Sequence, residues 1–124
     1  MLQHIALEIT KNDLTDFYVA ILGGKIVNHF ILEAEDAWQI FAVKRAVEVH
    51  YVEIEEMVYE LFIYPHSGSE SFNHHCLKME NASGIFKQAQ QNNYWTHLRA
   101  RNGKETYFIK DKNGNMFELK NNIK

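Results

Sequence analysis

The chain has 124 residues, the length of one ordinary domain, and 46% of them are hydrophobic, which is enough for a sizeable core. Its formal net charge of −3 lacks the basic surplus that attracts nucleic acid or an anionic membrane, so neither is expected as a partner. There is no apolar run of about 18 residues and no signal-peptide pattern, and the single Cys76 excludes an internal disulfide, so we expect a cytoplasmic protein.

The first part of the chain, residues 1–65, combines an early helix with several strands. Residues 4–9 alternate weakly in polarity and include β-branched side chains, which indicates a strand. Apolar residues recur at helical spacing over 11–24, and a pair of glycines ends that helix. Further strands are predicted at 25–33, 46–54 and 57–64. The segment 34–43 is ambiguous, but aromatic residues three positions apart favour a short extra helix there.

The second part, residues 72–124, repeats this order of elements after a linker predicted at 66–71. A strand, a helix and three more strands are predicted at 72–79, 82–93, 95–100, 104–110 and 116–120. The Asn102-Gly103 dipeptide between two of these strands is a strong hairpin signal. Each part is therefore a module that consists of a strand, a helix and a run of strands.

The two modules also align with each other at residues that can bind metal. Residues 2–9 placed over 72–79 pair His4 with His74, and 58–61 placed over 116–119 pair Glu60 with Glu118. Few positions are identical, so the evidence lies in the order: each module opens with a histidine strand and closes with a glutamate strand.

Strand alternation separates the adjacent histidines His74 and His75. His4 and Glu8 fall on one face of the first strand, and His74 and Lys78 fall on the matching face of its counterpart. His75 falls on the opposite face, which carries apolar residues and should pack against the helix. We therefore expect His74 to face a cavity and His75 to pack or form hydrogen bonds on the helix side.

Two imidazoles and two carboxylates form a donor set that suits a divalent first-row metal such as Zn, Ni, Co, Mn or Fe(II). A metal with an open position can polarise a carbonyl or enediolate oxygen, and a carboxylate that leaves the metal can accept a proton beside the carbonyl. The alternative is that the histidines and glutamates are structural or solvated and that the cavity holds only a small-molecule ligand.

These motifs resemble the vicinal oxygen chelate superfamily, which includes glyoxalase I, methylmalonyl-CoA epimerase, extradiol dioxygenases and the fosfomycin and bleomycin resistance proteins. The resemblance covers nearly the whole chain and rests on the motifs 4-HIALEI-9, 17-FYVAILGGKIV-27, 59-YELFIY-64, 73-NHHCLKMEN-81 and 111-DKNGNMFELK-120. It implies an α+β fold in which two tandem βαβββ modules form a cupped mixed sheet around a metal. The family's ligand positions fall on His4, Glu60, His74 and Glu118, and many relatives are homodimers.

The resemblance also implies a function. We expect a glyoxalase-like, divalent-metal-dependent lyase or isomerase acting on a small carbonyl compound, with Glu118 or Glu60 moving the proton. The alternative is a non-catalytic protein of the bleomycin-resistance type that binds a drug or metabolite. A dioxygenase or thiol transferase is less favoured, because those relatives use two histidines and one carboxylate and would omit Glu60. The sequence also lacks a cationic cavity signature, which counts against the transferases. Glu8 occupies the position where glyoxalase I carries an arginine, which argues against a glutathione hemithioacetal as substrate.

Other residues are weaker candidates for contact with the substrate. Glu8 and Lys78 either pair with each other or bind substrate, and Trp38 and Phe41 either line the cavity or pack in the core. The strand residues His97, Arg99 and Arg101 share one face that could hold an anionic substrate, but a solvated strand face is the favoured interpretation.

Overall fold

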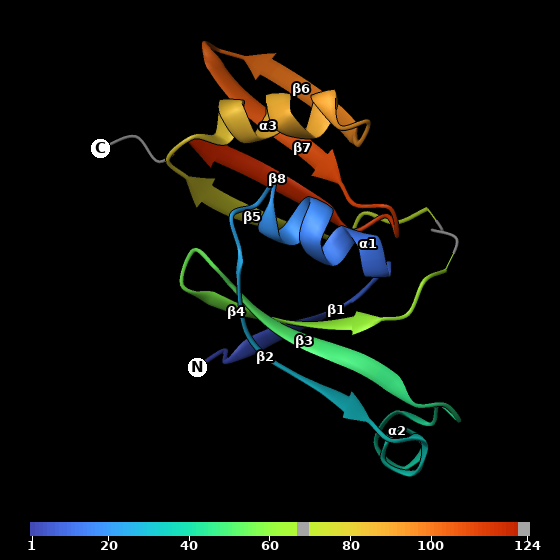
Figure 1. Ribbon diagram of the computed structural model, residues 1–124. Coiled ribbons are helices and arrows are strands. Elements are labelled where there is room, and N and C mark those ends of the chain that lie inside the picture. The colour runs from blue at the N-terminus through green and yellow to red at the C-terminus, as the bar shows by residue number, and fades with distance from the viewer. Residues whose placement is uncertain (67–69, 122–124) are drawn as a thin grey trace. The chain divides into compact units, whose positions relative to one another are not determined.

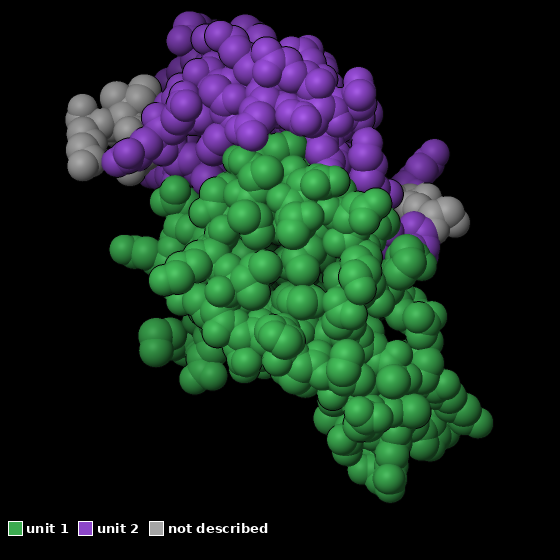
Figure 2. Space-filling view, in the orientation of Figure 1, with its two compact units in different colours: residues 1–65 green, residues 66–124 purple. Residues whose placement is uncertain are grey.

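The computed structural model describes residues 1–66 and 70–121, which belong to two compact units, Met1–Pro65 and His66–Lys124 (Figure 2). Each unit contains one four-stranded sheet (Figure 1). Residues 67–69 of the linker predicted at 66–71 lie outside the described residues. In the described parts of the chain, no helix has the length and apolar character needed to cross a membrane.

The first unit has the strand order β1-β4-β3-β2, with β1 and β4 parallel and the other neighbours antiparallel. Its elements are β1 (His4–Ile9), α1 (Lys11–Asp13), η1 (Leu14–Val19), β2 (Lys25–Leu32), α2 (Ala34–Phe41), β3 (Val47–Ile54) and β4 (Met57–Ile63). The helix predicted over 11–24 is shorter, because α1 continues into the π-helical η1 and ends at Val19. The extra helix predicted within 34–43 is confirmed as α2.

The second unit repeats this topology with the strand order β5-β8-β7-β6, in which β5 and β8 are parallel. Its elements are β5 (His74–Met79), α3 (Ala82–Gln91), β6 (Trp95–Arg101), β7 (Lys104–Lys110) and β8 (Met116–Asn121). The prediction of two tandem βαβββ modules is therefore confirmed. The first strand of this unit begins two residues later than predicted, because Phe72 and Asn73 lie outside the ladder.

In each unit, the core lies between one face of the sheet and the helix that covers it. The α3 helix packs across β6, β7 and β8, and the Phe86 ring lies 5.3 Å from the Tyr107 ring. Strands β1 and β5 share one pattern of exposure, in which every second side chain turns inward and the last one, Ile9 or Met79, is buried. The residues on the other face of these strands are exposed, so each sheet keeps one open face.

The close approach of the early helix to its sheet depends on Gly24. A Cβ atom added there would lie 2.5 Å from Cγ1 of Val52 on β3 and 2.7 Å from the carbonyl oxygen of Tyr18. No side chain fits in that space, so a glycine is required where the chain leaves η1 and enters β2.

Two-residue turns close the β3–β4 and β6–β7 hairpins. Both residues of each turn have positive φ, at 48° and 68° for Glu55 and Glu56 and at 53° and 73° for Asn102 and Gly103. Asn-Gly is the preferred sequence for such a turn, whereas two glutamates are not, because their Cβ atoms disfavour the left-handed region. The first hairpin therefore contains local backbone strain that the second avoids.

Candidate functional site

The first unit brings together one histidine and one glutamate predicted to bind metal. His4 lies at the start of β1, and Glu60 lies on the adjacent β4 opposite Ala6. The His4 Nε2 atom is 3.8 Å from Glu60 Oε1, and the two side chains are 46% and 12% exposed. Tyr51 is the neighbour of Glu60 on β3, and its hydrogen bond to Glu60, together with burial, raises the pKa of its hydroxyl group. The hydroxyl group therefore remains a proton donor to the Glu60 carboxylate.

The second unit brings together the repeat-equivalent pair. His74 begins β5, Glu118 lies on β8, and His74 Nε2 is 3.2 Å from Glu118 Oε1. On the other side of the ring, His74 Nδ1 is 2.9 Å from the carbonyl oxygen of Phe72. A carbonyl oxygen only accepts, so Nδ1 must carry the proton, and in the neutral ring Nε2 then presents a lone pair toward Glu118. A backbone carbonyl that fixes the tautomer in this way is typical of metal-binding histidines.

The distance within this pair fits a shared metal ion. Two ligand atoms that each lie about 2.0–2.2 Å from one ion, at angles of about 90–110°, are separated by about 2.8–3.6 Å. The 3.2 Å separation in the second unit lies in this range, whereas the 3.8 Å separation in the first is wider. Within the described residues, no group of three or more His, Cys, Asp or Glu side chains is placed to hold a metal ion. The four-ligand set from the sequence therefore remains a prediction.

The position of Glu118 depends on the turn that precedes β8. Both backbone N–H groups of Asn113 and Asn115 donate to Asp111 Oδ1, at 3.0 and 2.8 Å, and the Asn115 side chain donates to Oδ2 at 2.8 Å. Asp111 is buried, and its own N–H donates to the carbonyl oxygen of Asn115. The D-x-x-G-N motif thus fixes the turn from which β8 and Glu118 extend.

The neighbours of Glu118 define its chemical surroundings. Lys120 Nζ lies 3.6 Å from Glu118 Oε2. Partial burial of the Cys76 thiol, followed by the negative charge of Glu118, raises the pKa of Cys76, which faces Glu118 across the β5–β8 ladder. Cys76 therefore stays a neutral thiol beside Glu118.

His75 differs from His74 as strand alternation predicts. It is half-buried on the opposite face of β5, where its ring lies 5.6 Å from the ring of Phe117. Burial, with a smaller contribution from the charge of His74, lowers the pKa of His75. His75 is therefore a neutral packing residue, whereas His74 points toward Glu118.

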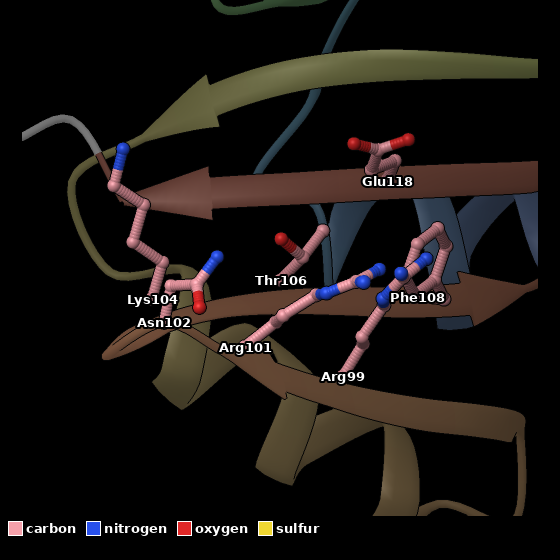
Figure 3. A pocket seen from close by; sticks show the side chains of 7 residues that line it. All are labelled: Arg99, Arg101, Asn102, Lys104, Thr106, Phe108 and Glu118. Carbon is pink, nitrogen blue, oxygen red and sulfur yellow. The ribbon is translucent and has the colours of Figure 1, made fainter.

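A cationic pocket of about 370 Å³ lies on the open face of the second sheet, beside Glu118 (Figure 3). It is lined by Arg99, Arg101, Asn102, Lys104, Thr106, Phe108 and Glu118. Figure 3 shows the Arg99 and Arg101 side chains extending from β6 across β7, on the same side of the sheet as Glu118. The sequence placed the two arginines on one face but favoured a solvated surface, and it did not associate them with Lys104 or Glu118.

Comparisons with known proteins identify the fold. No protein-family model matches the sequence, and no curated protein matches it significantly. Solved structures do match: FosX, a fosfomycin resistance protein from Listeria monocytogenes, has 14% identity and a TM-score of 0.74 and covers 99% of this chain and 93% of its own. FosX from Mesorhizobium loti has 14% identity and a TM-score of 0.69, with 97% and 90% covered. A glyoxalase family protein from Enterococcus faecalis has 18% identity and a TM-score of 0.68, with 96% and 95% covered.

The chain has the vicinal oxygen chelate fold. At 14–18% identity, the likeness concerns the fold rather than the activity of these neighbours. His4 and Glu60 lie on β1 and β4, and His74 and Glu118 lie on β5 and β8; their role as metal ligands remains a prediction.

The substrate-binding candidates occupy open parts of the vicinal oxygen chelate fold. Glu8 and Lys78 are exposed on the same strand faces as His4 and His74. On α2, the ring of Phe41 lies 5.6 Å from that of Phe62, while Lys44 Nζ lies 4.6 Å from the ring centre of Trp38. Both aromatic residues of α2 are about half exposed. Their contact with a substrate remains a prediction.

Proposed function

We propose that this protein is a divalent-metal-dependent enzyme of the glyoxalase type, a lyase or isomerase that acts on a small carbonyl compound. The observation that carries the proposal is the His74–Glu118 pair. The His74 Nε2 atom lies 3.2 Å from a Glu118 carboxylate oxygen, and the Nδ1 atom faces the Phe72 carbonyl oxygen, so a neutral His74 ring would direct its lone pair toward Glu118 and a cation between them would be bound by both. Structures of FosX from Listeria monocytogenes contain Mn(II), which supports a divalent ion in this fold.

In the proposed site, His4, Glu60, His74 and Glu118 bind the ion. Imidazole and carboxylate donors accept Zn, Ni, Co, Mn or Fe(II), so the donor set supports a first-row metal without selecting one. When bound, the metal supplies Lewis-acid stabilisation of the negative charge that develops on a substrate oxygen.

We assign proton transfer to Glu60 rather than to Glu118. The 3.8 Å separation from His4 leaves Glu60 less closely paired with a ligand histidine than Glu118 is at 3.2 Å. The Tyr51 hydroxyl group donates to the Glu60 carboxylate and restricts its orientation on the open face. A positioned carboxylate of this kind can take a proton from the carbon beside a carbonyl group and return it at a neighbouring atom.

Metal analysis of protein purified without chelator tests the proposal. We expect about one equivalent of a divalent ion per chain in the wild type and its loss in His4→Ala, His74→Ala and Glu118→Ala. His29→Ala on β2 serves as a control, because its ring stacks on His50 at 5.7 Å and is not part of either pair. Full metal content in the three ligand variants would refute the site.

The main alternative is a non-catalytic protein that binds a small molecule. The half-exposed Trp38 and Phe41 on α2 favour an apolar ligand of this kind. Quenching of Trp38 fluorescence by an apolar ligand in a metal-free Trp95→Phe variant, without turnover of any carbonyl compound, would support this alternative. We also propose a homodimer in the cytoplasm, and light scattering in solution gives the oligomeric state directly.

A further inference from the structure

We propose that two copies of this chain associate through the edge strand β2, which pairs in antiparallel fashion with β2 of the second copy. This inference rests on the homodimer that accompanies the proposed function, and it goes beyond it by naming the interface and its register. The interface depends only on residues of the first unit and requires no metal, so it can be measured separately from the proposed chemistry.

Strand β2 lies at the edge of the first sheet and, among the described residues, has a strand neighbour on one side only, β3 (Figure 1). All of its side chains except the last are exposed. Four of them are apolar: Ile26, Val27, Phe30 and Ile31 are 39%, 44%, 36% and 53% exposed. An edge that presents unpaired backbone groups together with apolar side chains is a template for a further strand.

The other sheet edges are protected by charge. A charged residue inside an edge strand discourages pairing, because its side chain would lose water when another strand is added. Strand β1 carries Glu8, β5 carries Lys78, and β6 carries Arg99 and Arg101. No charge lies inside β2, whose only charged residue is its first, Lys25. Each chain therefore has one unprotected edge in the described sheets, and self-pairing of that edge closes at two copies instead of continuing into a filament.

The backbone of β2 indicates how the two strands pair. The His29 N–H group donates to the Asn28 side chain at 2.9 Å, as expected for a group on the open edge. Alternate residues of an antiparallel strand direct their backbone groups to the same side, so Ile31 presents its N–H and carbonyl groups to this edge as well. If His29 of each copy pairs with Ile31 of the other, both pairs exchange backbone hydrogen bonds. Phe30 then lies on the two-fold axis opposite Phe30 of the second copy, which forms an aromatic cross-strand pair.

The charges at the two ends of β2 favour this antiparallel arrangement. With Phe30 at the centre, position 25 of one copy lies opposite about position 35 of the other, so Lys25 comes close to Glu33 and Glu35 of the second copy. None of these three residues has an ion pair within the described residues. In one chain, Lys25 and Glu33 are separated by eight positions of extended strand, or about 26 Å, and cannot pair. Antiparallel association therefore joins opposite charges at both ends, whereas parallel association would join like charges.

The pairing also joins the open faces of the two first sheets. A two-fold axis perpendicular to the sheet keeps the same face of both copies on one side, so two four-stranded sheets become continuous through β2. Phe30 lies on this face, with its ring 5.9 Å from the ring of Tyr51, the hydrogen-bond partner of Glu60. The interface therefore extends to a neighbour of the proposed proton-transfer residue.

Sedimentation equilibrium of the protein, with and without EDTA, measures the dimer Kd and tests the proposal. Ile31→Lys should raise this Kd at least about 10-fold, because it places a charge inside the paired edge. Leu98→Lys on β6 is the matched control: it adds the same charge at a 41% exposed apolar position of another edge strand and should leave the Kd unchanged. Lys25→Glu should also weaken the dimer. The triple variant Lys25→Glu/Glu33→Lys/Glu35→Lys should restore it, because the reversed charges meet only across the interface.

Cross-linking tests the register. In a Cys76→Ser background, Phe30→Cys should form a disulfide-linked dimer on mild oxidation, because residues opposite each other in a non-hydrogen-bonded pair have Cα atoms about 4.5 Å apart, within disulfide range. Leu98→Cys in the same background should remain unlinked.

The outcomes separate this interface from the proposed function. A wild-type dimer whose Kd is unchanged in Ile31→Lys, or equally raised in Leu98→Lys, would overturn the β2 interface. If circular dichroism shows that Ile31→Lys does not fold, the exposed charge-swap variants decide, and failure of the triple variant to recover the dimer overturns the interface. A monomeric wild type, or oligomers that grow beyond two copies, would overturn the closed dimer as well but would not affect the metal site. A β2-dependent dimer that binds no metal would leave the interface in place and refute the metal enzyme.

Discussion

Replacing His74 by alanine should abolish metal-dependent stabilisation, whereas replacing its neighbour His75 by isoleucine should preserve it. His74 directs Nε2 toward Glu118 at 3.2 Å, while His75 packs on Phe117 on the other face of β5. Isoleucine is the residue that β1 carries at the matching position, so His75→Ile keeps the volume of the side chain and removes a half-buried polar ring.

The size of the effect follows from linkage between binding and unfolding. At a metal concentration of about 100 times Kd, binding stabilises the native state by about 2.7 kcal/mol. An unfolding entropy of about 2.1 cal/mol/K per residue over 124 residues converts this into a rise in Tm of about 10 °C. Removing a residue that forms a hydrogen bond with a metal ligand weakens metal affinity about 10–100-fold. Removing the ligand itself should weaken metal affinity at least about 100-fold. At the same metal concentration the shift in His74→Ala should then be below about 2 °C.

The assay compares Tm values of EDTA-treated wild type, His74→Ala and His75→Ile with and without added Mn(II). His75→Ile should show the full wild-type shift, and its metal-free Tm should equal or exceed that of the wild type. A full shift in His74→Ala would refute the assignment of His74 as a ligand. An equal loss of the shift in both variants would show that β5 responds as a whole and that strand alternation does not separate the two histidines.

Three further predictions concern stability. Glu56→Gly should raise the free energy of unfolding by about 1 kcal/mol, because Glu56 has a φ of 68°, which glycine adopts without strain. Gly103→Ala should lower it by about as much, because Gly103 has a φ of 73°. Urea unfolding measures both changes. Asn81→Ala should cost about 1 kcal/mol in the same assay, because the Asn81 side chain accepts the backbone N–H three residues later at the start of α3. The hydrogen bond with His50 is the main cause that lowers the pKa of the Glu48 carboxyl group. The ionised carboxylate therefore stabilises the folded protein above pH 4.5, the ordinary pKa, and this stabilisation is lost as the pH falls through the lowered pKa. His50→Phe should therefore flatten the fall in urea midpoint below about pH 4.5, and unchanged slopes would contradict this.

The fold was predictable because the sequence repeats its pattern of burial. Strands β1 and β5 have the same alternation of exposed and inward residues, and their bounds depend on local signals that the sequence contains. The misplaced start of β5 has a local cause. The Asn73 N–H bonds to the Ser71 side chain, and the Phe72 carbonyl oxygen bonds to the His74 ring, so both backbone groups are occupied before the ladder begins. Whether a side chain takes a backbone hydrogen bond away from the strand ladder depends on its rotamer, and the periodicity of the sequence does not predict rotamers.

The cationic pocket was only partly accessible from the sequence. The Asn102-Gly103 turn fixes the hairpin register, so the pairing of Arg101 with Lys104 follows once that turn is recognised. The place of Glu118 beside these residues does not follow from local signals. It requires β7 to pair with β8 across the five-residue loop that Asp111 organises, and the register of such a loop depends on hydrogen bonds of a buried carboxylate.

The two units show how one scaffold supports different surroundings for equivalent carboxylates. Glu60 and Glu118 hold matching positions on the last strand of each module, yet Glu60 is contacted by the neutral phenol of Tyr51, and Glu118 adjoins Lys120 and the cationic pocket. The pocket is built entirely on β6, β7, β8 and one turn, and three of its residues lie on the edge strand β6 or the turn after it. Substitutions there leave both His–Glu pairs in place. If the pocket binds substrate, substitutions on β6 should change substrate preference without replacing a residue of either His–Glu pair.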